Sequence, residues 1–161
     1  MKNAFCTMVV GTMLAVAGVG VAWAADKKID PVVGTWTLNL TKSKFSPGPA
    51  PKSQTRTYAQ SDDGVSLTVT GVAGDGSTIS QQSTFKYDGK AYPFSGAADY
   101  DAISLKRVNG STVKSAMLKA GKQVGSTTRT ISAHGKVLTL STKATGADGK
   151  AYDNVAVYDK Q

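Results

Sequence analysis

The sequence predicts an all-β fold, an antiparallel up-and-down β-barrel of about 8–10 strands built from two similar halves. One observation is an internal repeat: residues 55–76 and 128–149 align without a gap, and each copy has the pattern of strand, turn, strand, turn. A repeated unit of this kind buries its apolar face against its partner. A second observation is composition. All 11 acidic residues are aspartate, which favours turns and caps, and glutamate, which favours helix interiors, is absent.

The first segment, residues 1–24, has the pattern of a signal peptide. Lys2 supplies the positive charge, residues 8–21 form the apolar stretch, and Ala22-Trp23-Ala24 is a cleavage site before Ala25. The apolar stretch is short for a membrane span and a polar segment follows it, so we expect no stable membrane anchor. The sequence therefore predicts a periplasmic or secreted protein. Cleavage would also remove Cys6, leaving one domain that folds without disulfides.

Next comes a short leader, residues 25–33, in which Pro31 restricts the preceding residue to extended conformations. Residues 34–40 alternate, which predicts a strand with Trp36, Leu38 and Leu40 on one face. Residues 41–53 contain three prolines and predict a turn-rich connection over the surface or across a barrel end.

From residue 54 onward, apolar or threonine-rich runs alternate with turn signals at short spacing, as in barrels and sandwiches. A two-sheet sandwich is the structural alternative to a barrel. The turn signals are aspartate-, asparagine- or histidine-glycine pairs at residues 62–64, 74–76, 88–89, 109–110, 134–135 and 148–149. The remaining strands are expected within 54–72, at 79–87, 102–108, 112–118, 122–132 and 137–143, and at 152–158.

Charge favours some partners over others. There are 19 Lys and Arg residues against 11 aspartates, a net charge of +8, yet the lysines are scattered singly. The clustered basic surface of a nucleic-acid-binding protein is missing. We therefore expect no nucleic-acid partner, and we interpret the lysines as solvated surface residues.

The arginines differ from the lysines in strand phase. Arg56, Arg107 and Arg129 fall in step with apolar neighbours, whereas lysines such as Lys86 and Lys106 fall out of step. An inward guanidinium keeps its charge and needs a partner, and a carboxylate or phosphate ligand would match its planar donors. The alternative is structural: an inward arginine packs on an aromatic ring, for example Arg129 on Trp36, or pairs with an aspartate.

Other residues on inward strand positions add aromatic and polar surface. Gln81 shares a face with Phe85 and Tyr87, and a polar residue there suits a wet cavity better than a dry core. The expected ligand-binding residues are Arg56, Tyr58, Gln81, Phe85, Tyr87, Arg107 and Arg129.

Enzyme chemistry is poorly supplied. The single histidine, His134, falls in a predicted turn, and the mature chain would lack cysteine, so a metal site is not expected. Asp99 and Asp101 lack the spaced ligands of a calcium loop. No phosphate loop, dinucleotide fingerprint or nucleophile elbow is present. We expect a protein without cofactors or metal that is not an enzyme.

Two short motifs carry a family resemblance. Gly34-Thr35-Trp36 resembles the Gly-x-Trp signature that opens lipocalins and fatty-acid-binding proteins, and residues 155–160 resemble the closing strand of the latter. The resemblance implies a lipocalin-like barrel over 34–161, with Trp36 as a structural residue closing it, around a hydrophobic or amphipathic small molecule. It departs from the family in two respects. In lipocalins the arginine that packs on the first-strand tryptophan lies near the last strand, whereas here the last strand lacks an arginine and two predicted strands follow Arg129. Residues 41–53 also do not have the pattern of the helical lid of fatty-acid-binding proteins.

Two functions follow as expectations. The first is an exported protein that binds a hydrophobic or acidic amphipathic small molecule, such as a fatty carboxylate, with the three arginines meeting the acid. The alternative is a secreted protein-binding module, for instance a hydrolase inhibitor, that acts through loops such as 41–53 and has a filled interior. A protein partner is possible in that case.

Overall fold

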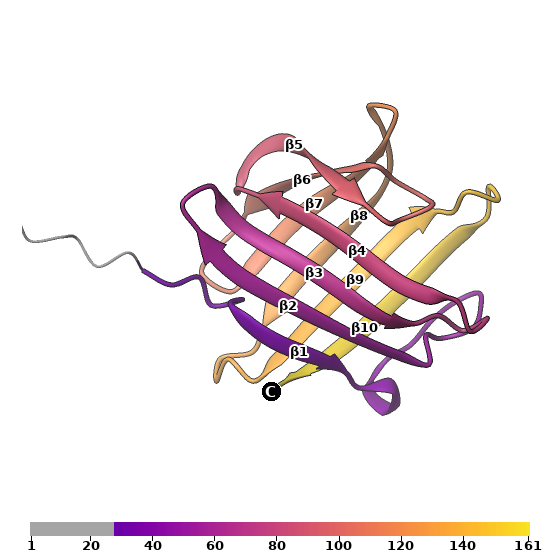
Figure 1. Cartoon of the computed structure of the whole chain (residues 1–161), viewed down its shortest axis with the longest axis horizontal. Coiled ribbons are helices and arrows are strands. Elements are labelled where there is room, and N and C mark those ends of the chain that lie inside the picture. The colour runs from indigo at the N-terminus through magenta and orange to yellow at the C-terminus, as the bar shows by residue number, and fades with distance from the viewer. Residues whose placement is uncertain (1–27) are drawn as a thin grey trace, which may run out of the picture.

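The structure, a computed structural model, describes residues 28–161, and Figure 1 shows them as one antiparallel sheet closed on itself. The proposed signal peptide, its cleavage site and Cys6 lie outside the described residues. The sheet closes through pairing of the first and last strands, which excludes the sandwich. The ten strands are β1 (Gly34–Leu38), β2 (Ser53–Ser61), β3 (Gly64–Val72), β4 (Thr78–Phe85), β5 (Asp88–Ser95), β6 (Ala102–Arg107), β7 (Thr112–Lys119), β8 (Lys122–Ile131), β9 (Val137–Thr145) and β10 (Ala151–Lys160), and a 3₁₀ turn, η1, covers Leu40–Lys42.

Strand order follows chain order around the barrel, so each strand pairs with its sequence neighbours. Short hairpins produce this order, and closure leaves no open sheet edge. Inward and outward positions alternate: Val65, Leu67 and Val69 on β3 are buried, and the lysines predicted to face outward are exposed. Within residues 28–161, no helix has both the length and the apolar character needed to cross a membrane.

The barrel has two ends. The leader end holds residues 28–33, the β2–β3, β4–β5, β6–β7 and β8–β9 connections and the C-terminus, at the left of Figure 1. The proline-rich end holds η1, residues 43–52 and the β3–β4, β5–β6, β7–β8 and β9–β10 connections. Beyond the end of β1, the proline-rich connection continues along β10, where Lys44 pairs with Val155 and the Ser46 carbonyl accepts from the Asp153 amide.

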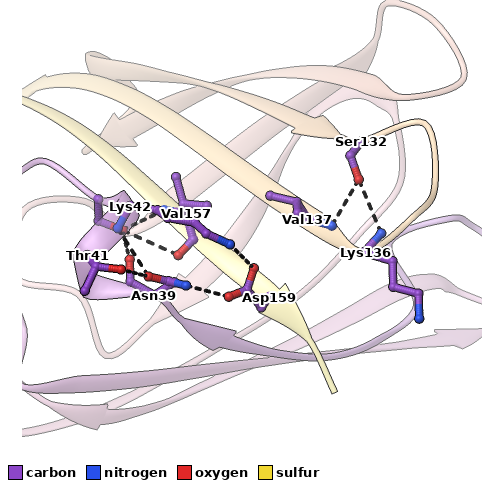
Figure 2. A network of polar contacts seen from close by, with 9 residues as sticks. Asn39, Thr41, Lys42, Ser132, Lys136, Val137, Val157 and Asp159 are labelled. Atoms are coloured by element: carbon purple, nitrogen blue, oxygen red, sulfur yellow. Dashed lines mark hydrogen bonds and ion pairs between the residues drawn. The ribbon is translucent and has the colours of Figure 1, made fainter.

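The first strand is shorter than the alternation predicts. It ends at Leu38, and Leu40 is 43% exposed in η1 rather than on the face of Trp36. The cause is Asn39, whose side chain accepts hydrogen bonds from the Lys42 amide and the Thr41 hydroxyl and donates to Asp159. Figure 2 shows this network, in which Asp159 also pairs with Lys42. A side chain that bonds its own backbone competes with the sheet ladder and starts a turn.

The turn signal at Asp88-Gly89 is also misplaced. The chain turns at Lys86 and Tyr87, and Asp88 and Gly89 begin β5, where the pairing with β6 shifts register. Gly89 has φ +79°, a value that suits glycine at a bulge. The β7–β8 turn carries none of the expected glycine pairs, since Ala120 and Gly121, both at positive φ, join the two strands, and β5 was not among the expected strands.

The repeat appears as the hairpins β2–β3 and β8–β9. Four strands separate them on one side of the barrel, and β10 and β1 separate them on the other. Arg56 pairs with Val69, whereas Arg129 pairs with Leu140, a register shift of two residues between the copies. A shift of two keeps every side chain on its face, so both arginines point inward.

Trp36 lies on the closing strand and has no exposed surface. Its indole Nε1 donates to the carbonyl of Val32 at 2.8 Å, and Val32 is also fully buried. Lys160 Nζ, not Arg129, lies over its ring, 5.1 Å from the centroid. The stretch 30–33 is therefore built into the leader end as a floor of the barrel.

Candidate ligand-binding site

A cavity of about 270 Å³ occupies the barrel interior towards the proline-rich end. Its lining comes from nearly every strand, with Phe45 of the proline-rich connection and Asp99 and Tyr100 of the β5–β6 connection added. Of the residues predicted to meet a ligand, five line it: Arg56, Tyr58, Gln81, Phe85 and Arg129.

One wall carries a row of polar side chains. Ser115, Thr127, Thr142 and Asn154 are successive register partners across β7, β8, β9 and β10, so they lie side by side on the inner face. The Thr127 and Thr142 hydroxyls are 2.9 Å apart, and Ser115 donates to the Thr127 carbonyl. We call these four residues the polar row. The sequence interpretation missed it, although each member is in phase with buried apolar residues of its own strand.

Arg56 enters the cavity from the opposite wall. Its Nε donates to the Tyr158 hydroxyl at 3.2 Å and its Nη1 to the Tyr58 hydroxyl at 3.5 Å. The Tyr158 hydroxyl in turn donates a hydrogen bond to the Gln54 side-chain oxygen, so it accepts from Arg56 and donates to Gln54. Nearby, burial raises the pKa of Tyr100 to about 12, although the Arg56 charge acts in the opposite direction. Tyr100 is therefore neutral at pH 7.

Arg129 is the more buried cation, only 6% exposed. Its Nη2 donates to the Tyr87 hydroxyl at 2.7 Å, and its Cζ lies 5.6 and 5.3 Å from the ring centroids of Tyr58 and Tyr87. Its Nε has no hydrogen-bond partner among the described residues. An unpartnered buried N–H of a cation carries a large desolvation cost.

Arg107 and Tyr87 lie outside the lining of this cavity, so the structure does not bring all three predicted arginines to one site. Arg107 forms an ion pair with Asp30 of the leader, and its Cζ lies 4.2 Å from the Tyr87 ring centroid. The Asp30 side chain is 8% exposed and also accepts a bond from the Val32 amide. Pairing of an inward arginine with an aspartate was the structural alternative from the sequence, but no local pattern singled out Asp30, which lies 77 residues from Arg107.

These leader-end residues border a separate pocket of about 440 Å³, together with Lys28, Ile29 and Phe85. Burial raises the pKa of the Tyr87 phenol, with Asp30 adding to the rise and Arg129 opposing it. Tyr87 is therefore a neutral phenol that contacts a cation of each pocket. Its hydroxyl accepts from Arg129 of the central cavity, and its ring packs on Arg107 of the leader-end pocket.

The charge balance of the central cavity is the main electrostatic finding. Among residues 28–161, neither Arg56 nor Arg129 has a carboxylate within ion-pair distance. Asp99 is the single carboxylate in the lining, and it accepts from the Ala147 amide at the proline-rich end. Burial and then the Asp99 charge raise the pKa of Tyr152 to about 12. The cavity lining therefore presents two guanidinium charges and one carboxylate, and its other polar groups are neutral phenols, hydroxyls and amides.

His134 and Asp101 lie outside the cavity lining. His134 is exposed in the β8–β9 turn, and Asp101 accepts a hydrogen bond from the Ala120 amide of the β7–β8 turn. Within residues 28–161, no group of three or more His, Cys, Asp or Glu residues is placed to hold a metal ion.

Comparisons with known proteins add little to this description. No family model and no curated protein matches the chain. Among solved structures, it is similar to a redesigned beta barrel, mFAP1, bound to DFHBI, with a TM-score of 0.41 and 13% sequence identity over 81% of this chain and 95% of that one. That TM-score is too low to carry a functional inference. The strand topology and the cavity define the class of this protein as a closed ten-strand antiparallel barrel with an internal cavity.

Proposed function

We propose that this protein binds a small acidic molecule in the central cavity, as an exported lipocalin-like carrier without catalytic activity. The observation that supports this proposal is that the three inward arginines differ in whether they have an acidic partner. Arg107 has an internal acid in Asp30, whereas Arg56 and Arg129 share a cavity and have no acid partner among the described residues.

Burial of an uncompensated charge is expensive, of order several kcal/mol after relaxation. In the empty state, Arg56 and Arg129 meet only neutral phenols and aromatic rings among residues 28–161, and these offset this cost in part. An anion in the cavity would offset both costs, and a guanidinium offers planar paired donors to a carboxylate. Residues that lower the stability of the empty protein are often kept because they are needed for function, as in a binding site.

The competing hypothesis of a loop-acting inhibitor expects a filled interior. The cavity of about 270 Å³, with a polar row on one wall, favours the binding function instead. Within the described lining, one carboxylate and no histidine are present, which supports a carrier over an enzyme.

The test starts from the full chain, residues 1–161 with the expected signal peptide, expressed in a bacterial host. Mass spectrometry of the protein recovered from the periplasm or medium would read an N-terminus at Ala25 if the export proposal is right. An intact chain that stays with the cells would contradict export without bearing on the cavity.

Binding is then measured by isothermal titration with acids and their amides, benzoate against benzamide and octanoate against octanamide, after the protein is unfolded and refolded to remove carried ligand. We expect saturable binding of an acid and much weaker binding of its amide. The double variant R56Q/R129Q should lose the acid. The matched control K106Q/K114Q removes two charges from exposed register partners on the outer face and should retain it. Equal binding of acids and amides, or unchanged binding by R56Q/R129Q, would contradict the proposal.

A further inference from the structure

We infer, on the basis of the proposed function, that the ligand is a compact diacid, with two separate acidic groups on a body about the size of one aromatic ring. This departs from the single-headed fatty carboxylate expected from the sequence. It follows from where the two cations lie, which donors they keep, and how much space there is.

The two guanidiniums reach the cavity from different walls. Arg56 lies on β2 and Arg129 on β8, and β9, β10 and β1 separate these strands on the shorter path around the barrel. The Tyr58 side chain contacts both, with its hydroxyl at Arg56 Nη1 and its ring under Arg129. Because Arg56 and Arg129 come from different strands and contact different parts of Tyr58, two acids joined by a ring, one for each cation, match this arrangement.

Each cation keeps donors for such a group. A guanidinium has five N–H donors, and the bonds in the structure use two nitrogens of Arg56 and one of Arg129. Two like charges held in one low-dielectric cavity also repel each other, so a ligand with two negative charges offsets more than a monoacid does.

Cavity size limits the rest of the ligand. In another protein, an apolar cavity of about 150 Å³ takes one benzene, or about 25 Å³ per non-hydrogen atom. At that ratio the cavity of about 270 Å³ holds roughly 11 non-hydrogen atoms. A benzene ring with two carboxylates has about this size, while a sixteen-carbon fatty acid would leave much of its chain outside.

The walls suit a flat ring with polar edges. Tyr58, Phe85 and Phe94 offer aromatic surface, and the polar row on the facing strands offers hydroxyl and amide groups to carboxylate oxygens. A long alkyl chain would instead lie against the polar row and displace water from the hydroxyl groups of that row, which costs free energy.

The experiment compares three probes of graded charge and size by isothermal titration with the purified protein: isophthalate, its monoamide 3-carbamoylbenzoate, and hexadecanoate. The monoamide has the shape of isophthalate and one charge fewer. We expect isophthalate to bind about tenfold or more tightly than the monoamide, because each charge-assisted contact contributes on that scale. Hexadecanoate should bind more weakly than isophthalate.

Single variants locate the second acid. R56Q and R129Q should each remove the advantage of isophthalate over the monoamide, while K106Q, on the outer face, should keep it. Circular dichroism melts confirm that each variant is folded, and R56K and R129K serve where a glutamine variant does not fold, with reduced advantage expected from the loss of planar donors.

The outcomes separate this inference from the function beneath it. Equal affinity for isophthalate and the monoamide, or tighter binding of hexadecanoate, would overturn the diacid and leave an acid-binding barrel. An advantage that survives both single variants would overturn the two-cation assignment. Absence of binding by every acid, benzoate and octanoate included, would overturn the diacid and the proposed function together.

Discussion

The ion pair between Asp30 and Arg107 ties the leader to the barrel, and replacing Asp30 with asparagine tests how much it contributes. Asparagine keeps an oxygen for the Val32 amide but removes the charge that Arg107 faces. Breaking a buried pair costs about 3–5 kcal/mol, and an exposed pair contributes about 0–1 kcal/mol. The side chains of Asp30 and Arg107 are 8% and 34% exposed, which places this pair between those limits. We expect D30N to lower the free energy of unfolding by about 2 kcal/mol.

The assay is urea unfolding followed by far-ultraviolet circular dichroism, with free energies from linear extrapolation. The matched control is D153N, which breaks the pair between Asp153 and Lys143, whose side chains are 55% and 78% exposed. It should change stability by less than about 0.5 kcal/mol. A D30N variant no less stable than D153N would refute the reasoning, because it would mean that the leader pair is as solvated as the surface one. The double variant D30N/R107Q should recover part of the loss, since it removes the charge left unpaired.

Three further predictions concern packing and ionisation. In G96A, the new Cβ would lie 1.9 Å from the Ser80 carbonyl oxygen at φ +81°, whereas in G89A it meets nothing within 4 Å at φ +79°. We expect G89A to lose about 1 kcal/mol of stability from backbone strain alone and G96A to lose clearly more, measured by the same unfolding assay. Similar losses in the two variants would contradict the close approach. Trp36→Phe removes the donor of the buried Val32 carbonyl and should cost about 2–4 kcal/mol, against less than about 0.5 kcal/mol for Val108→Ala, whose side chain lies at a position 55% exposed. A W36F loss as small as that of V108A would show that the indole contact is dispensable. Burial raises the pKa values of Tyr100 and Tyr152 to about 12 in the folded protein, above the unfolded value of about 10. The native state therefore holds more protons than the unfolded state between about pH 10 and 12, so stability should fall as pH rises through this window, and Tyr152→Phe should flatten the fall. A stability that stays level while the phenols titrate would contradict the burial of these rings.

Periodicity made the orientation of the arginines predictable. Arg56 and Arg129 are each in step with apolar residues of their strand, and a strand alternates its faces strictly, so local sequence determines which way these side chains point. The same reasoning placed Lys86 and Lys106 on the outside, where they are exposed. The all-β class and the sequential antiparallel pairing were predictable from turn signals at short spacing, whereas the pairing of β1 with β10 decided for a barrel over a sandwich.

Local competition explains where the pattern misled. Leu40 continues the alternation of β1 in the sequence, but the Asn39 side chain accepts a hydrogen bond from the Lys42 amide, which starts a turn and leaves Leu40 exposed. Asp88-Gly89 has the composition of a tight turn and instead begins β5 with a bulge. In both cases a hydrogen bond to a side chain or a shift in the partner strand decides between two conformations that the residues themselves allow equally.

By itself, the sequence determined the fold class, the alternation of faces and the inward direction of three arginines, since each depends on residues within one or two strands. The tertiary structure alone decided which of these cations has an acid. Arg107 meets Asp30 from a leader 77 residues away, while Arg129 meets Tyr87 and no described carboxylate. That outcome depends on closing the barrel, because closure brings the leader under one end and sets β2 and β8 around a single cavity. No local pattern encodes such a meeting of distant strands, and the function proposed for this protein rests on it.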